Sequence, residues 1–139
     1  MGYPPLARER RPMAKILICD DSISMRKTML EILESGGHEA IVGEDGLNAA
    51  KLYREHGPDC ALLDIEMPIM TGIEAVTKIM LTDPAAKITM VTSERSETDV
   101  LKVMTAGASD YVGKPYSRER LLETVDKLLG IAEAEPGAA

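Results

Sequence analysis

The 139-residue sequence has no tryptophan, no phenylalanine and no long apolar run. A membrane-spanning helix needs roughly 20 consecutive and mostly apolar residues, so no such span is expected although 45% of the residues are hydrophobic. The first twelve residues contain three prolines and three arginines, without the apolar segment of a secretory signal. We therefore expect residues 1–13 to be a flexible leader and the protein to be cytoplasmic, with no membrane as a partner.

Positive charge and cysteine are also scarce. The 16 lysines and arginines stand against 23 acidic residues, which gives a net charge of -7, and no basic cluster follows Arg11. Because binding to a phosphate backbone requires clustered cations, nucleic acid is not an expected partner. Cys19 and Cys60 lie inside short apolar runs and are expected to be reduced core residues. His38 and His56 lack partners at metal-ligand spacing, and surface or capping positions are expected for both.

From Lys15 onward, short apolar runs alternate with longer stretches of helical periodicity. This alternation is typical of a parallel α/β sheet. One domain is predicted over residues 14–130, followed by a flexible tail over 131–139. The expected strands cover residues 15–19, 39–42, 60–63, 88–91 and 111–112. The expected helices run from 22 to 35, from 45 to a stop at 57–58, from 71 to 83–84, from 96 to 107 and from 117 to 130.

Start and stop signals support these helices. Asp45 is a residue of N-cap type, Thr71 and Glu74 have capping-box spacing, and Gly36-Gly37 provides a left-handed stop. One apolar stripe is expected on each of the last three helices. They comprise Ile73, Val76, Ile79 and Met80; Val100, Val103 and Met104; and Leu121, Leu122, Val125, Leu128 and Leu129. Five strands alternating with five helices predict a doubly wound, flavodoxin-like fold, for which the strand order 2-1-3-4-5 is typical.

Polar residues stand directly after four of the expected strands: Asp20 and Asp21, Asp64, Thr92 and Lys114. The carboxyl ends of parallel strands form the crevice where ligands bind. Three neighbouring carboxylates repel one another unless a cation compensates them, and Mg2+ prefers such oxygen ligands. The simpler alternatives are that Asp21 only caps the first helix and that Thr92 only caps the fourth.

Four separated motifs carry a family resemblance. They are DDS at 20–22, DIEMPIMTG at 64–72, MVTSE at 90–94 and AGASDYVGKP at 106–115. In this order they resemble the receiver domains of two-component response regulators, over roughly residues 14–130. The run DDSISMR at 20–26 resembles the chemotaxis members in particular.

The resemblance implies that Asp64 is the phosphoacceptor. It implies Mg2+ as the cofactor, held by Asp21, Asp64 and the backbone carbonyl of Glu66, with Asp20 acting through metal-bound water. Lys114 would contact the phosphoryl group, and its bond to Pro115 would be cis. Thr92 and Tyr111 would form the switch. Tyr116 stands where many relatives have phenylalanine, and no effect on the chemistry is expected from that difference.

The resemblance also implies partners. A sensor histidine kinase or a histidine phosphotransfer domain would supply the phosphoryl group, and a target protein would dock on the fourth helix, fifth strand and fifth helix. The protein would then be a signalling phosphoacceptor and not an enzyme. One alternative is a relay intermediate that passes phosphate to a histidine phosphotransfer protein. Two others from different classes are a metal-dependent phosphohydrolase, suggested faintly by Asp64-x-Glu66, and a flavin carrier on the same fold.

Overall fold

The computed structural model describes residues 14–93 and 97–130. A five-stranded parallel sheet in the order β2-β1-β3-β4-β5 alternates with five helices, which confirms the predicted class and strand order. The strands are β1 (Lys15–Cys19), β2 (Glu39–Gly43), β3 (Cys60–Leu63), β4 (Ile88–Thr92) and β5 (Asp110–Gly113), and the helices are α1 (Ile23–Ser35), α2 (Gly46–His56), α3 (Gly72–Thr82), α4 (Glu97–Ala106) and α5 (Arg118–Leu129).

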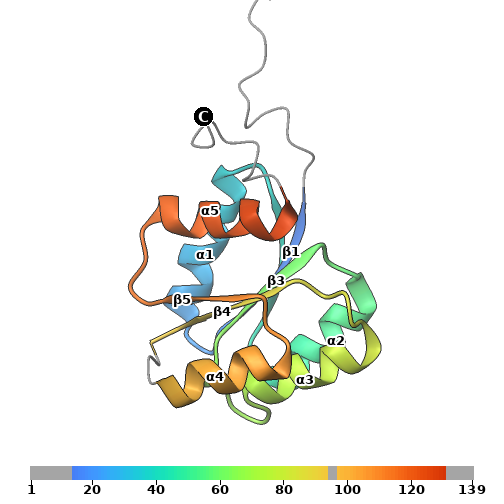
Figure 1. Ribbon diagram of the computed structural model, residues 1–139. Coiled ribbons are helices and arrows are strands. Elements are labelled where there is room, and N and C mark those ends of the chain that lie inside the picture. The colour runs from blue at the N-terminus through green and yellow to red at the C-terminus, as the bar shows by residue number, and fades with distance from the viewer. Residues whose placement is uncertain (1–13, 94–96, 131–139) are drawn as a thin grey trace, which may run out of the picture.

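The helices form two layers. Helices α1 and α5 cover one face of the sheet, and α2, α3 and α4 cover the other (Figure 1). Each buried strand serves both faces, since successive side chains point in opposite directions. In β1, for example, Leu17 and Cys19 pack toward α2 and α3, whereas Ile16 and Ile18 pack toward α1 and α5. This double burial explains why β1, β3 and β4 read as continuous apolar runs.

The predicted helix starts are confirmed at four N-caps. The side chains of Ser22, Asp45, Thr71 and Ser117 each accept a hydrogen bond from a backbone N–H in the first turn. The capping box of Thr71 with Glu74 is complete, because the Glu74 carboxylate also accepts the Thr71 N–H at 2.9 Å. At the end of α1, Gly37 and not Gly36 takes the left-handed conformation, with φ of 87°.

Burial at two positions refines the predictions. His38 is only 5% exposed and takes the capping position of the two predicted for it, since its N–H donates to the Leu33 carbonyl at the end of α1 at 3.0 Å. Met104 is 42% exposed, so that Val103 is the buried anchor of α4 and the predicted stripe there is narrower. Both cysteines are free and buried, as expected.

Some predictions fall on residues that are not described. The leader over 1–13, the tail over 131–139 and the start of the fourth helix at Ser96 lie outside the described residues. Within the described ranges, no helix combines the length and apolarity needed to cross a membrane.

Candidate functional site

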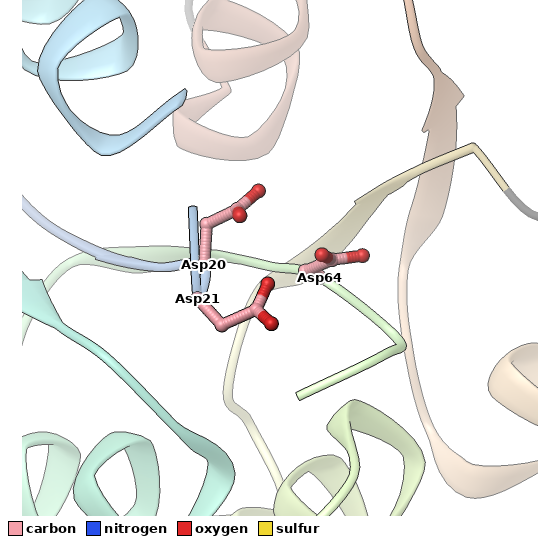
Figure 2. Close-up of side chains that lie close together, drawn as sticks. All are labelled: Asp20, Asp21 and Asp64. Atoms are coloured by element: carbon pink, nitrogen blue, oxygen red, sulfur yellow. The ribbon is translucent and has the colours of Figure 1, made fainter. Parts of the chain in front are cut away.

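Three carboxylates meet where β1 and β3 end. Cys19 and Leu63 are partners in the ladder between these strands, so Asp20, Asp21 and Asp64 emerge side by side. One oxygen from each carboxylate lies within 4.8 Å of the others, and Figure 2 shows the three side chains close together. Asp20 and Asp64 are 1% and 7% exposed, whereas Asp21 faces solvent. The cluster is therefore buried at Asp20 and Asp64 and accessible to solvent at Asp21.

Asp20 is held by contacts from three directions. Its Oδ1 accepts the Ser22 N–H at 2.9 Å, and its Oδ2 accepts the Lys114 ammonium at 2.6 Å. Its backbone carbonyl accepts a hydrogen bond from the Arg26 guanidinium at 2.8 Å. Because Ser22 caps α1, the alternative in which Asp21 serves only as the cap is wrong. The Asp21 carboxylate is left for another role.

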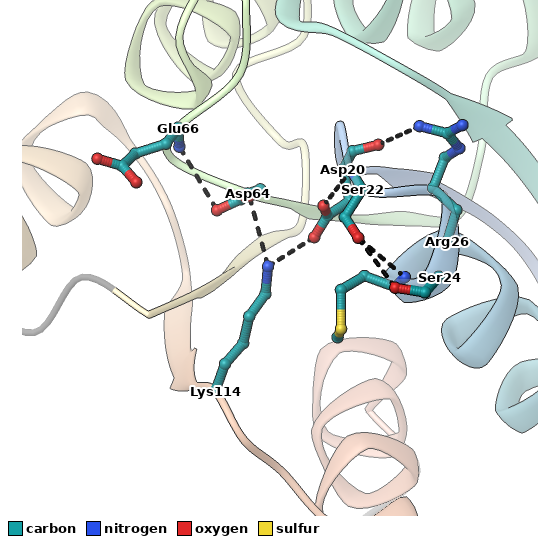
Figure 3. Close-up of polar contacts among 8 residues, drawn as sticks. Asp20, Ser22, Ser24, Arg26, Asp64, Glu66 and Lys114 are labelled. Carbon is teal, nitrogen blue, oxygen red and sulfur yellow. Dashed lines mark hydrogen bonds and ion pairs between the residues drawn. The ribbon is translucent and has the colours of Figure 1, made fainter.

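Lys114 links the two buried acids. It follows β5, and its Nζ lies 2.6 Å from Asp20 Oδ2 and 3.4 Å from Asp64 Oδ2 (Figure 3). Burial acts to lower the pKa of the Lys114 ammonium, but the hydrogen bond to Asp20 and the charges of Asp64 and Asp20 outweigh it and raise that pKa. Lys114 is therefore a fixed cation at this edge of the sheet.

Asp64 experiences the opposite balance. Burial raises the pKa of its carboxyl, the charge of Lys114 works against that rise, and repulsion from Asp20 adds to it. The net direction is upward because burial outweighs the charge of Lys114, which lies closer to Asp20 than to Asp64. Without a further cation, the negative charge on Asp64 is incompletely compensated.

The backbone around Asp64 is tightly packed. Its Oδ1 is 3.4 Å from the Glu66 N–H, and the Glu66 side chain is exposed and points away from Asp64 in Figure 3. At Gly72, the first residue of α3, a Cβ atom would lie 2.0 Å from the Asp64 carbonyl oxygen. Only glycine permits this close approach of α3 to the end of β3.

Thr92 and Tyr111 lie on the neighbouring strands. Thr92 is the last residue of β4, is fully buried, and its carbonyl accepts the Lys114 N–H at 2.9 Å. Since α4 begins at Glu97, the alternative in which Thr92 caps that helix is wrong. Tyr111 is half-buried in β5 and packs against the core on the α2–α4 side. The bond between Lys114 and Pro115 is cis.

The donor set fits a hard divalent cation. Three carboxylates offer oxygen ligands from one small region. The neighbouring Lys114 supplies a positive charge and no metal ligand. Mg2+ is typically held by one or two carboxylates and keeps several waters, which suits a cluster with one exposed side. The residues present therefore fit Mg2+.

The comparisons with known proteins agree with this geometry. The chain matches the response regulator receiver domain over residues 16–126 and belongs to that family. It is similar to the chemotaxis protein CheY of Listeria monocytogenes, with 39% identity over 83% of this chain and 98% of the relative. It is also similar to the solved structure of CheY4 from Vibrio cholerae, with 32% identity, a TM-score of 0.81, and coverage of 85% of this chain and 100% of that one.

A second similar solved structure is a complex that includes Mg2+. It is the complex of CheX with CheY, BeF3 and Mg2+ from Borrelia burgdorferi, which is 32% identical with a TM-score of 0.79 over 83% of this chain and 88% of that one. Membership of the family makes the chain a signalling phosphoacceptor and not an enzyme in the ordinary sense. The phosphohydrolase and flavin-carrier alternatives therefore lose their basis.

Two features of the site were not anticipated from the sequence. Lys114 bonds more closely to Asp20 than to Asp64, and Arg26 holds the Asp20 carbonyl. The position of Arg26, six residues after Asp20 on α1, was the available signal, because a long side chain at the end of the first turn of a helix reaches back to the strand before it.

Proposed function

We propose that the chain is an Mg2+-dependent response regulator that accepts a phosphoryl group on Asp64. The observation that supports this proposal is that the Asp64 carboxylate lies close to Asp20, Asp21 and the Lys114 ammonium at one edge of the sheet. In the proposed reaction an Asp64 oxygen attacks the phosphorus of a phosphohistidine, the phosphorus–nitrogen bond breaks, and an acyl phosphate forms. A sensor histidine kinase or a histidine phosphotransfer domain is the donor.

Each neighbour has a proposed task. Asp21, Asp64 and the Glu66 carbonyl hold the metal directly, and Asp20 holds it through water. Mg2+, when bound, neutralises phosphoryl charge and orients the phosphoryl oxygens. The Lys114 ammonium shifts from a carboxylate to a phosphoryl oxygen, a charge-assisted contact that its position 3.4 Å from Asp64 supports. Phosphoryl transfer needs mainly this positioning and charge compensation.

The proposed output starts at Thr92 and Tyr111. A phosphoryl group adds charge and acceptor oxygens beside the end of β4, where the Thr92 hydroxyl donates to one of them. Tyr111, one strand away, turns into the space that Thr92 leaves. The surface of α4, β5 and α5 then changes and docks a target protein. Leu101 and Met104 on α4 are 67% and 42% exposed, which supports an apolar contact there.

The setting of this reaction is proposed from the relatives. Several are named chemotaxis protein CheY, including those of Listeria monocytogenes and Vibrio cholerae. We therefore assign the chain to a chemotaxis-type phosphorelay in the cytoplasm.

The first test is the intact mass after incubation with acetyl phosphate and Mg2+. Wild type is expected to gain one phosphoryl group, and Asp64→Asn and an EDTA-treated sample to gain none. Asp59→Asn is the matched control, because Asp59 precedes β3 and Asp64 follows it, so the two acids lie at opposite ends of one strand. If Asp64→Asn were phosphorylated as well as wild type, Asp64 would not be the acceptor.

A further inference from the structure

Tyr116 presents a buried hydroxyl that packing alone does not explain. Its ring is partly buried and packs against the core between the sheet, α1 and α5. The hydroxyl oxygen is inaccessible and has no hydrogen-bond partner among the described residues. A phenylalanine would fill the same space without burying a polar atom, and buried polar groups without a protein partner are usually satisfied by ordered water.

The surroundings of this hydroxyl point to Asp20. Tyr116 lies two residues after Lys114, whose ammonium contacts the Asp20 carboxylate at 2.6 Å. Burial raises the pKa of Tyr116 to about 12, and the negative charge of Asp20 contributes in the same direction. Tyr116 also packs against the core that contains Ile18, which lies two residues before Asp20, so it lies on the same side of the sheet as the end of β1 to which Lys114 bonds.

Asp20 has acceptor capacity to spare. A carboxylate offers about four lone-pair sites. The described contacts use one on Oδ1, for the Ser22 N–H, and one on Oδ2, for Lys114. A water between Asp20 and Tyr116 would accept from the phenol, donate to the carboxylate and so satisfy the buried oxygen.

We propose that Tyr116 is a positioning residue of the metal site, whose hydroxyl donates through a bound water to Asp20 and fixes the carboxylate that receives the hydrated Mg2+. This inference rests on the proposed function, because it assigns a partner to one of the proposed metal-holding residues. It also revises the expectation that a tyrosine here has no effect on the chemistry. Groups that orient a metal ligand from behind contribute measurably to metal affinity.

The test is calorimetric titration of the full chain with MgCl2 in wild type, Tyr116→Phe and Tyr53→Phe. Each variant removes one phenolic oxygen. The Tyr53 hydroxyl donates to Asp83 at 2.6 Å, at the opposite end of α3 from Asp64. We expect Tyr116→Phe to weaken Mg2+ binding about tenfold, the lower end of the effect of losing such an orienting partner. Tyr53→Phe should bind Mg2+ as wild type does.

Tyrosine absorption gives a second readout, because the chain has no tryptophan. An Mg2+-induced difference spectrum is expected in wild type and Tyr53→Phe and should be absent from Tyr116→Phe. Unchanged Mg2+ affinity in Tyr116→Phe, together with greater resistance to urea, would show an unsatisfied core hydroxyl and overturn the inference alone. If wild type itself binds no Mg2+, the inference and the metal dependence of the proposed function fail together.

Discussion

At the scale of single residues, the surroundings of Asp64 disfavour the charged form of its carboxyl. Its carboxyl is buried, Asp20 repels it, and Lys114 compensates it only from 3.4 Å, so its pKa is raised above the ordinary value of 3.8. Between that value and the native pKa, the folded protein binds more protons at this site than the unfolded chain does. The contribution of Asp64 to the free energy of unfolding therefore falls as pH rises through the native pKa.

Replacing this charge should stabilise the metal-free protein. We expect Asp64→Asn to have a higher free energy of unfolding than wild type at neutral pH, with the advantage shrinking as pH falls toward 3.8. Mg2+ should reverse the order, since a ligand at tenfold its Kd adds about 1.4 kcal/mol to the form that binds it. Urea unfolding at several pH values, with Mg2+ or EDTA, measures both effects. A variant less stable than wild type at neutral pH in EDTA would contradict this account of Asp64.

Thr89 has a buried hydroxyl that lowers the free energy of unfolding. It is fully buried in β4, and its hydroxyl has no partner in the described part of the chain. Thr89→Val should raise the free energy of unfolding by about 1 kcal/mol, because a buried unsatisfied hydroxyl is removed from a strand. Thr124→Val is the matched comparison: Thr124 is equally buried, but its Oγ1 donates to the Arg120 carbonyl at 2.9 Å. Thr124→Val should lose stability in the same urea titration. Equal changes in the two variants would show that the missing hydrogen bond of Thr89 does not lower stability.

At the scale of elements, sequence patterns located the helices well where local chemistry decides the boundary. Caps such as Thr71 with Glu74 act within one turn, so they are visible in the sequence. Strand ends were less certain, since β5 (Asp110–Gly113) exceeds the predicted 111–112 on both sides. Its ladder depends on pairing with β4, which no local pattern encodes. The contact between Lys114 and Asp20 likewise joins segments that are distant in the chain.

The start of α3 couples an element to the site. We expect Gly72→Ala to lower the free energy of unfolding by about 1 to 3 kcal/mol, because its Cβ would overlap the Asp64 carbonyl and force the backbone apart. It should also weaken Mg2+ binding, since the displaced backbone carries Asp64. Gly57→Ala provides the comparison: φ there is 55°, but no atom beyond its two chain neighbours lies within 4 Å of the added carbon. It should cost stability of about 1 kcal/mol through strain and leave Mg2+ affinity unchanged in calorimetric titration.

At the scale of the whole molecule, one sheet is shared by two cores. Cys19 belongs to the core on the α2–α4 side and Cys60 to the core on the α1–α5 side, although they lie on adjacent strands. Burial raises the pKa of each thiol to about 12, so neither reacts as a thiolate until its side of the sheet opens. The two cysteines therefore report separately on the two faces.

We expect both cysteines to be labelled at the same rate, because neither core can lose its helices without exposing the sheet that the other also needs. Measurement is by thiol labelling of the wild-type chain at neutral pH, with each site resolved by peptide mass. Mg2+ at tenfold its Kd should slow both rates about tenfold, because it stabilises only the folded form, and Asp64→Asn should show much less protection. Fast labelling of Cys19 with Cys60 still protected would instead show that the α2–α4 side opens alone, beneath the acidic site.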